Sequence, residues 1–215
     1  MTQPIDLYYW PTPNGWKISI ALEEMALPYS LHVVDIGAGE QFGPDFLAIA
    51  PNNRMPAIVD HDPQDGGAPI SIFESAAIMT YLADKNGKFM PQDVRGRTDV
   101  NQWLMWQMGG LGPMAGQSHH FRKFAAEQVP YAIDRYTNEV NRLYGVMERR
   151  LQDRDYLAGE YTIADMACWP WISRHEWQGQ QLDDFPKLKQ WFETIGARAA
   201  VQRGFALGRE LRPTP

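Results

Sequence analysis

A threonine and an asparagine stand two positions apart where a short strand turns into a helix. Thr12 and Asn14 flank Pro13 in this turn. A threonine hydroxyl is a common N-cap, and proline is favoured at the first helical position because its missing N–H group is not needed there. The turn offers a hydroxyl, an amide and free backbone N–H groups, which favour a bound anion. If the ligand is a thiol, they favour its thiolate and lower its pKa. The alternative is an ordinary helix cap without a ligand.

The elements that must position this turn follow from the hydrophobic periodicity. Apolar side chains alternate over residues 5–9, which predicts a strand, and they share one helical face over residues 18–25. A second strand is expected over residues 30–36, and a short helix from Pro44. Residues 57–60 and 69–73 can then pair as a hairpin, before Glu74-Ser75 opens another helix. This order is that of an α/β thioredoxin-like domain with a mixed four-stranded sheet covered by helices.

Beyond Gly87 the sequence has helical patterns only. An apolar-rich helix is expected over residues 94–108, and the glycine-rich segment 109–113 is expected to bend or break it. Thr162 and Asp165 have the spacing of a capping box at the start of a later helix. These patterns predict an all-α C-terminal domain. We expect residues 1–87 to form the thioredoxin-like domain, 88–97 a linker, 98–208 the all-helical domain and 209–215 a loose tail.

Composition excludes several classes of function. The 215 residues carry a net charge of −6 without a basic tract, which argues against nucleic acid as a partner. No apolar run approaches the roughly 18 residues of a membrane span, and the first residues lack the pattern of a secretory signal. A single cysteine excludes an internal disulfide and fits a reducing cytoplasm. Residues 1–87 carry a net charge of −8 and residues 88–215 a net charge of +2, which supports a boundary near residue 88.

Four sequence blocks, in order over essentially the whole chain, resemble those of the cytosolic glutathione transferases. They are Leu7-Tyr8-Tyr9 with Pro13-Asn14-Gly15, Asn53-Arg54-Met55-Pro56-Ala57-Ile58, Phe73-Glu74-Ser75-Ala76-Ala77-Ile78, and Tyr161-Thr162-Ile163-Ala164-Asp165. Further details are most similar to the bacterial Nu class. They are Thr12-Pro13-Asn14-Gly15, Gly39-Glu40-Gln41-Phe42, Gly109-Gly110-Leu111-Gly112-Pro113-Met114 and Pro130-Tyr131-Ala132-Ile133-Asp134-Arg135-Tyr136. That class resembles the transferases in fold and is best known for glutathione-dependent disulfide reduction.

The resemblance implies a role in glutathione binding for two pairs of residues. Met55 precedes Pro56, which is expected to follow a cis peptide bond, and the backbone of Met55 would pair with the cysteinyl part of glutathione. The alternative is a trans proline that opens a strand. Glu74 and Ser75 would hold the γ-glutamyl end, the carboxylate meeting the ammonium group and the hydroxyl meeting the carboxylate. The alternative for this pair is another helix cap, which is compatible with the binding role.

The resemblance also implies contacts to the other end of the tripeptide. Gln41, Asn53 and Arg54 would meet the glycyl carboxylate, and Arg135 would reach the ligand from the partner chain of a homodimer. The alternative for both arginines is a solvent-facing charge.

Thr12 and Asn14 would lie near the sulfur of glutathione as the catalytic residues. Most transferase classes use a Tyr, Ser or Cys side chain there, so Tyr8 and Tyr9 are the alternatives on the preceding strand. We favour Thr12 and Asn14 because the turn follows immediately. This turn contains no cysteine, so the thiol chemistry would come from glutathione itself.

Other reactive side chains have simpler explanations. Cys168 lies in an apolar run, where a lone cysteine is usually a small core residue. His119 and His120 lack a third ligand at helical spacing, so we expect no metal and place them in a cleft or on a helix surface. The capping role explains Asp165 better than acid catalysis.

The leading hypothesis is a cytoplasmic, homodimeric enzyme of the glutathione transferase fold that acts as a glutathione-dependent disulfide-bond reductase. It would bind reduced or oxidised glutathione and direct the thiolate at a small disulfide or another electrophile. The alternatives are a conjugating transferase or peroxidase, and a non-catalytic glutathione-binding regulatory protein. The sequence leaves the second substrate open.

Overall fold

The chain folds into two compact units. A computed structural model describes residues 4–211, and the last four residues of the predicted tail lie outside that range. One unit comprises the chain up to Lys88 together with the segment from Ala199, and the other is Phe89–Arg198. The first has α/β structure and the second is all helical, which confirms the predicted fold class. Within the described range, no helix combines the length and the apolar character that crossing a bilayer requires.

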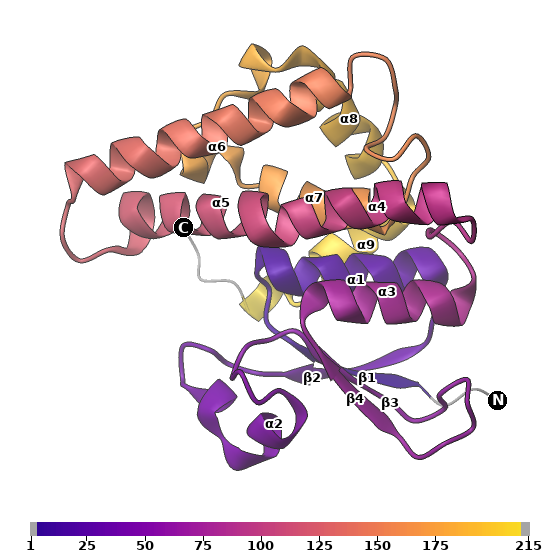
Figure 1. Cartoon of the computed structure of the whole chain (residues 1–215). Helices are drawn as coiled ribbons and strands as arrows, with labels where there is room; N and C mark the ends of the chain where they lie inside the picture. The colour runs from indigo at the N-terminus through magenta and orange to yellow at the C-terminus, as the bar shows by residue number, and fades with distance from the viewer. Residues whose placement is uncertain (1–3, 212–215) are drawn as a thin grey trace. The chain divides into compact units, whose positions relative to one another are not determined.

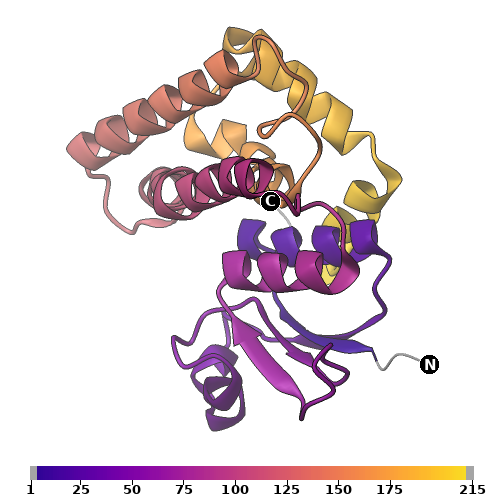
Figure 2. The ribbon, with the colours of Figure 1, turned by 45° about the vertical axis from the view of Figure 1, so that its right-hand side comes forward.

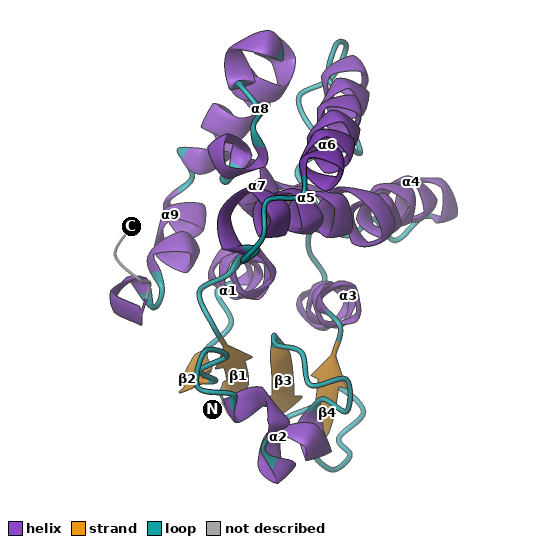
Figure 3. Ribbon diagram, turned by 90° about the vertical axis from the view of Figure 1, so that its left-hand side faces the viewer, coloured by secondary structure: helices purple, strands orange, loops and turns teal. Residues whose placement is uncertain are grey.

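The first unit is built on a mixed four-stranded sheet in the order β2-β1-β3-β4. Strand β1 runs parallel to β2 and antiparallel to β3, and β3 is antiparallel to β4, so Leu7 of β1 lies opposite Leu31 of β2 and Ile58 of β3. Figure 1 labels the strands, and Figure 3 shows them in this order. Their bounds are Ile5–Tyr9 for β1, Tyr29–Val33 for β2, Ala57–Asp60 for β3 and Ile70–Phe73 for β4. The second strand therefore ends three residues before the predicted position.

Two helices cover one face of the sheet and one covers the other. Helices α1 (Pro13–Met25) and α3 (Ser75–Asn86) lie side by side on one face, and α2 (Pro44–Ile49) lies on the opposite face (Figure 3). The predicted cap is confirmed: the Thr12 hydroxyl accepts a hydrogen bond from the backbone N–H of Gly15 at 3.4 Å, and proline occupies the first helical position. The strand and the cap together fix where the first turn of α1 stands.

The last helix packs in the first unit. Helix α9 (Ala199–Ala206) lies against α1, where the Ser19 hydroxyl donates to the Gly204 carbonyl oxygen at 2.7 Å. A Cβ atom on Gly204 would come within 2.7 Å of Ile20 Cα, so glycine permits this close approach. The sequence analysis assigned residues 98–208 to one helical domain. The structure instead groups α9 with the sheet, because these long-range contacts leave no periodic signal in the sequence.

The second unit consists of helices and the segments that connect them, among them a long loop over residues 151–162 (Figure 2). Helix α4 begins within the predicted linker 88–97, where the Asp93 side chain caps it by accepting from the backbone N–H of Gly96 at 3.0 Å. Helix α5 packs on α6, and α4 packs on α7. The bounds are Val94–Trp106 for α4, Gly112–His119 for α5, Pro130–Arg150 for α6, Ile163–Ile172 for α7 and Pro186–Gly196 for α8.

The glycine-rich segment after α4 does not break the helix. A π-helical turn at Gln107–Leu111 connects α4 to α5, and the backbone at Gly112 is still right-handed helical. Pro113 sits in the first turn of α5, where its missing N–H group is tolerated. A Cβ atom on Gly112 would lie 2.6 Å from Gln107 Nε2, so the glycine makes room inside the turn. The sequence predicted a bend or a break at this segment, and the break does not occur.

Candidate functional site

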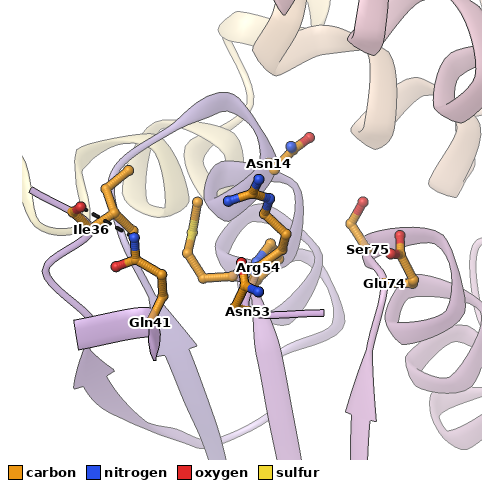
Figure 4. A pocket seen from close by; sticks show the side chains of 9 residues that line it. Asn14, Ile36, Gln41, Asn53, Arg54, Glu74 and Ser75 are labelled. Atoms are coloured by element: carbon orange, nitrogen blue, oxygen red, sulfur yellow. Dashed lines mark hydrogen bonds between the residues drawn. The ribbon is translucent and has the colours of Figure 1, made fainter. Parts of the chain in front are cut away.

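A cavity of about 340 Å³ opens in the first unit (Figure 4). Its walls come from the start of α1, the loop after β2, the loop before β3 and the start of α3. Eight of the ten predicted site residues line it, together with Ile36, for which the sequence suggested no role. The eight are Asn14, Gln41, Asn53, Arg54, Met55, Pro56, Glu74 and Ser75.

Both predicted catalytic residues lie at the start of α1, but only Asn14 lines the cavity. Asn14 is half-buried and lines the cavity. Thr12 stands beside the cavity, where its hydroxyl oxygen caps α1 and its O–H group points at Met55 Sδ, 3.8 Å away. Sulfur is a weak acceptor, so this contact to Met55 is a weak hydrogen bond. A ligand sulfur at this turn would meet the Asn14 amide more directly than the Thr12 hydroxyl.

The loop before β3 carries the confirmed cis peptide bond between Met55 and Pro56. Asn53, two residues earlier, has a left-handed backbone with φ of 49°, a conformation that asparagine tolerates better than most residues. Figure 4 shows Asn53 and Arg54 side by side at the cavity. Arg54 is exposed and brings a permanent positive charge. On the neighbouring loop, Gln41 is buried and its Nε2 donates to the Ile36 carbonyl oxygen at 3.4 Å.

The start of α3 supplies a carboxylate and a hydroxyl. Glu74 is the N-cap residue of α3, with a φ of 69°, but its side chain makes no capping hydrogen bond. The exposed carboxylate is therefore not used to cap the helix. Ser75 is buried, and its hydroxyl oxygen accepts from Lys17 Nζ at 3.3 Å. The sequence analysis gave Lys17 no role, although a charged residue within the apolar run of α1 was a visible signal.

Arg135 lies in the other unit. It is an exposed residue of α6, where it lines a second cavity of about 700 Å³ together with residues of α5 and α6 such as Met114 and Arg142. Its predicted contact with glutathione across a dimer therefore stays a prediction.

Neither tyrosine of β1 occurs among the described residues that line the cavity. Tyr9 is fully buried, and its hydroxyl donates to the Leu207 carbonyl oxygen at 3.0 Å. The Tyr8 ring stacks on His32 with a centroid distance of 4.9 Å. Burial, followed by the charges of Asp6 and Asp45, raises the pKa of Tyr8. These contacts give both rings structural roles.

Three other side chains that could be reactive are buried, namely Cys168, Asp165 and His119. Cys168 is fully buried in α7. The Asp165 carboxylate completes the confirmed capping box with Thr162 and also accepts from Trp191 Nε1 at 2.9 Å, and its complete burial raises its pKa to about 6. His119 was expected in a cleft or on a surface but is buried; desolvation lowers its pKa to about 4. Residues 4–211 contain no group of three or more His, Cys, Asp or Glu side chains that could hold a metal ion.

The cavity combines groups of both charges within a small volume. Arg54 and the starts of α1 and α3 favour anions, while Glu74 favours a cation. Three amide side chains and a hydroxyl add neutral hydrogen-bonding groups. This arrangement suits a short zwitterionic peptide with carboxylates at both ends and an anionic atom near α1.

Comparison with known proteins gives consistent matches over both units. Residues 12–85 match the model of the glutathione S-transferase N-terminal domain, and residues 112–199 match that of the C-terminal domain. The chain is 54% identical over 200 residues to the disulfide-bond oxidoreductase YfcG of Escherichia coli, with 92% of each chain covered.

Two solved structures match over nearly the whole chain. A glutathione transferase from Burkholderia graminis, with two glutathione molecules bound per subunit, is 43% identical with a TM-score of 0.90, covering 96% of this chain and 89% of its own. A glutathione transferase from Pseudomonas putida, with one glutathione disulfide bound per subunit, is 40% identical with a TM-score of 0.89, covering 95% of this chain and 92% of its own.

Proposed function

Because the chain belongs to the glutathione S-transferase family, we propose that it is a glutathione-dependent disulfide-bond reductase. The observation that carries the proposal is the cavity of the first unit, whose lining gathers two helix starts, a cation, a carboxylate and amides. The name of the 54% identical relative, a disulfide-bond oxidoreductase, supports this choice among the activities of the family.

The first step is the ionisation of the glutathione thiol at the start of α1. The Asn14 amide and the first backbone N–H groups of α1 donate toward the sulfur, and the helix dipole adds a partial positive charge there. Thr12 holds this turn in place through its cap. No base has to take up the proton directly, because water receives it once the pKa of the thiol is lowered.

The second step is attack of this thiolate on a small disulfide. One sulfur of the substrate forms a bond with the glutathione sulfur, the substrate S–S bond breaks, and the other sulfur leaves as a thiolate that takes up a proton. A second glutathione thiolate then attacks the mixed disulfide, which yields glutathione disulfide and the second reduced thiol. Cys168 takes no part, because it is the only cysteine of the chain and is fully buried.

The other residues of the cavity bind the two ends of the tripeptide. Glu74 pairs with the γ-glutamyl ammonium group, and Ser75 donates to the α-carboxylate. Arg54, with Gln41 and Asn53, meets the glycyl carboxylate. Met55, before the cis bond to Pro56, aligns its backbone with the cysteinyl residue.

The proposal includes a homodimer in the cytoplasm. Large apolar side chains are exposed on both units, among them Phe42 at 59%, Met105 at 53% and Tyr131 at 74%, and a partner chain would shield such side chains from water. In the dimer, Arg135 reaches the glutathione of the partner subunit. The single cysteine supports a reducing compartment.

Turnover of a small symmetric disulfide tests the proposal. The purified protein is mixed with glutathione and bis(2-hydroxyethyl) disulfide, and glutathione disulfide is followed through NADPH consumption by glutathione reductase. We expect turnover well above the uncatalysed exchange. Binding of glutathione without turnover favours the regulatory alternative, and turnover of a chlorinated aromatic or a peroxide in place of the disulfide favours the conjugating or peroxidase alternative.

A further inference from the structure

Tyr9 is a buried tyrosine that stands directly before the turn with Thr12 and Asn14. It is the last residue of β1 and is 0% exposed. A phenylalanine ring would fill the same space, so packing alone does not require the hydroxyl group. That hydroxyl donates to the Leu207 carbonyl oxygen at 3.0 Å, which joins β1 to the segment that follows α9. The link between these two distant segments therefore calls for an explanation.

The ring of Tyr9 lies between the first turn of α1 and the segment after α9. A Cβ atom on Gly15, in that turn, would lie 3.0 Å from Tyr9 Cε2. A Cβ atom on Gly208, in the segment after α9, would lie 3.3 Å from Tyr9 Cε1. Because both residues are glycines, their backbones approach the ring closely. The turn and the segment thus contact opposite edges of one ring.

The segment after α9 is held in place along α1. The Phe205 ring packs edge-on against Trp16 with a centroid distance of 4.7 Å. Arg203 Nε pairs with Glu23 Oε2 at 2.6 Å, farther along α1. These contacts fix α9 against α1 near both ends of the helix. The carbonyl oxygen of Leu207 is therefore an anchor for the phenol group.

The exact position of the first turn matters for the proposed chemistry. Hydrogen bonds to an anion weaken steeply when their geometry departs from the optimum. A displacement of reacting groups by about 1 Å can cost about a hundredfold in rate. The Thr12 cap fixes the turn from within, and the Tyr9 ring supports it from outside. A small movement of this ring would therefore reach the donors that face the sulfur.

We propose that Tyr9 is a positioning residue that links the first turn of α1 to the segment after α9 and thereby holds Asn14 where it stabilises the glutathione thiolate. The inference rests on the proposed binding of glutathione at this turn. It extends that proposal to the residue and the segment that set the position of the turn. Tyr9 does not line the cavity, so its effect on the sulfur passes through the turn.

The pKa of the thiol of bound glutathione tests this role. The proteins are the wild type, Tyr9→Phe, which keeps the ring, and Tyr29→Phe as a matched control. Tyr29 also uses its hydroxyl on a contact to α1, but donates to Glu23 Oε1 at 3.0 Å and does not line the cavity. The absorbance of the bound thiolate is recorded against pH. The rate of disulfide reduction, the dissociation constant of glutathione and thermal denaturation are measured on the same proteins.

We expect Tyr9→Phe to raise the pKa of the bound thiol by about 0.5–1 unit, which lowers the rate below the wild-type midpoint about threefold to tenfold. The dissociation constant measured below that midpoint should change by less than about twofold, because the neutral thiol bound there needs no stabilisation of charge. Tyr29→Phe should lose a comparable amount of thermal stability and leave the thiol pKa unchanged.

A second pair of variants acts on the same ring from its other edge. Gly208→Ala adds a Cβ atom close to Tyr9 Cε1 at a backbone φ of 62°. Gly66→Ala adds one at a φ of 68°, where no described atom beyond the chain neighbours lies within 4 Å. Both variants carry similar backbone strain, but only Gly208→Ala presses on the ring and should raise the thiol pKa. This pair provides the same test if Tyr9→Phe does not fold.

Other results would overturn the inference. An unchanged thiol pKa in Tyr9→Phe, or in Gly208→Ala where Tyr9→Phe does not fold, means that the ring only supports the fold. An equal rise in Tyr29→Phe means that any loosening of the unit has the same effect. A wild type that binds no glutathione refutes the proposed function, and the inference with it. A wild type that binds the thiolate but reduces no disulfide refutes only the proposed reaction, because the thiolate absorbance still tests Tyr9.

Discussion

Replacing Asn14 with alanine tests whether the start of α1 stabilises a bound thiolate. Asn14 lines the cavity at the second position of α1. Its amide N–H group forms a stronger hydrogen bond with the ionised sulfur than with the neutral thiol. Loss of this amide therefore raises the pKa of the bound thiol. The rate of disulfide reduction at saturating glutathione increases with pH, and the midpoint of this increase lies at a higher pH in the variant than in the wild type.

The size of the shift follows from the burial of the side chain. A hydrogen bond to a charged group contributes about 1.5–3 kcal/mol. Asn14 is only half-buried, so water replaces part of the lost bond and the lower end of that range applies. At 1.36 kcal/mol per unit, the pKa of the thiol rises by about 1 unit. Below the wild-type midpoint, the rate falls about tenfold.

The assay is a pH–rate profile of disulfide reduction for the wild type, Asn14→Ala and Asn52→Ala. Asn52 is an exposed asparagine that does not line the cavity, so its variant should give the wild-type curve. The absorbance of the bound thiolate gives the pKa without turnover. If Asn14→Ala has the same midpoint as the wild type and the same rate, the sulfur does not lie at this turn and the reasoning fails.

Three further predictions concern stability, measured by urea denaturation. Thr12→Val removes the cap of α1 and should lower the free energy of unfolding by about 1 kcal/mol. Gly204→Ala places a Cβ atom 2.7 Å from the α1 backbone and should cost about 1–3 kcal/mol; no loss would show that α9 can shift freely. Burial lowers the pKa of His119 to about 4 and raises that of Asp165 to about 6. Between pH 6.5 and about 4, His119 is neutral in the folded protein but protonated in the unfolded chain. The free energy of unfolding therefore decreases by roughly 3 kcal/mol as pH falls through this range. Ionising folded Asp165 costs a similar amount as pH rises from 3.8 to about 6. The two effects oppose each other between about pH 4 and 6. His119→Gln keeps only the effect of Asp165 and should lose stability as pH rises, whereas Asp165→Asn keeps only the effect of His119 and should gain stability. Parallel curves of stability against pH for the two variants would contradict these pKa shifts.

Local patterns were sufficient for much of the fold. The cis bond before Pro56 was predicted from the family resemblance and is confirmed. The N-cap at Thr12 and the capping box at Asp165 were predicted from short motifs and are also confirmed. Each depends on residues within a few positions of one another, where propensity and hydrogen-bonding geometry act directly. The cavity residues were chosen by resemblance, which carries information about distant segments that periodicity lacks.

Features that depend on distant contacts were missed. In the sequence, Gly204 is a residue that is unfavourable within a helix. The close approach of the α1 backbone at Ile20 explains why glycine stands there. The burial of Lys17 and its contact with Ser75 were not predicted, because both depend on the packing of α1 against α3. His119 is buried because α7 and the following turn bring Trp171 and Trp177 against its ring, at centroid distances of 5.9 and 5.7 Å.

The grouping of α9 with the sheet has a consequence for folding during translation. The chain leaves the ribosome from its first residue onward, and domains usually fold as soon as they have emerged. Here the partner of α1 is encoded after all of the second unit. We therefore expect the second unit to be able to fold during translation, whereas the first unit is complete only after nearly the whole polypeptide has been released. A stop codon shortly before Ala199 would remove the helix that packs on α1 without deleting any residue that lines the cavity of the first unit.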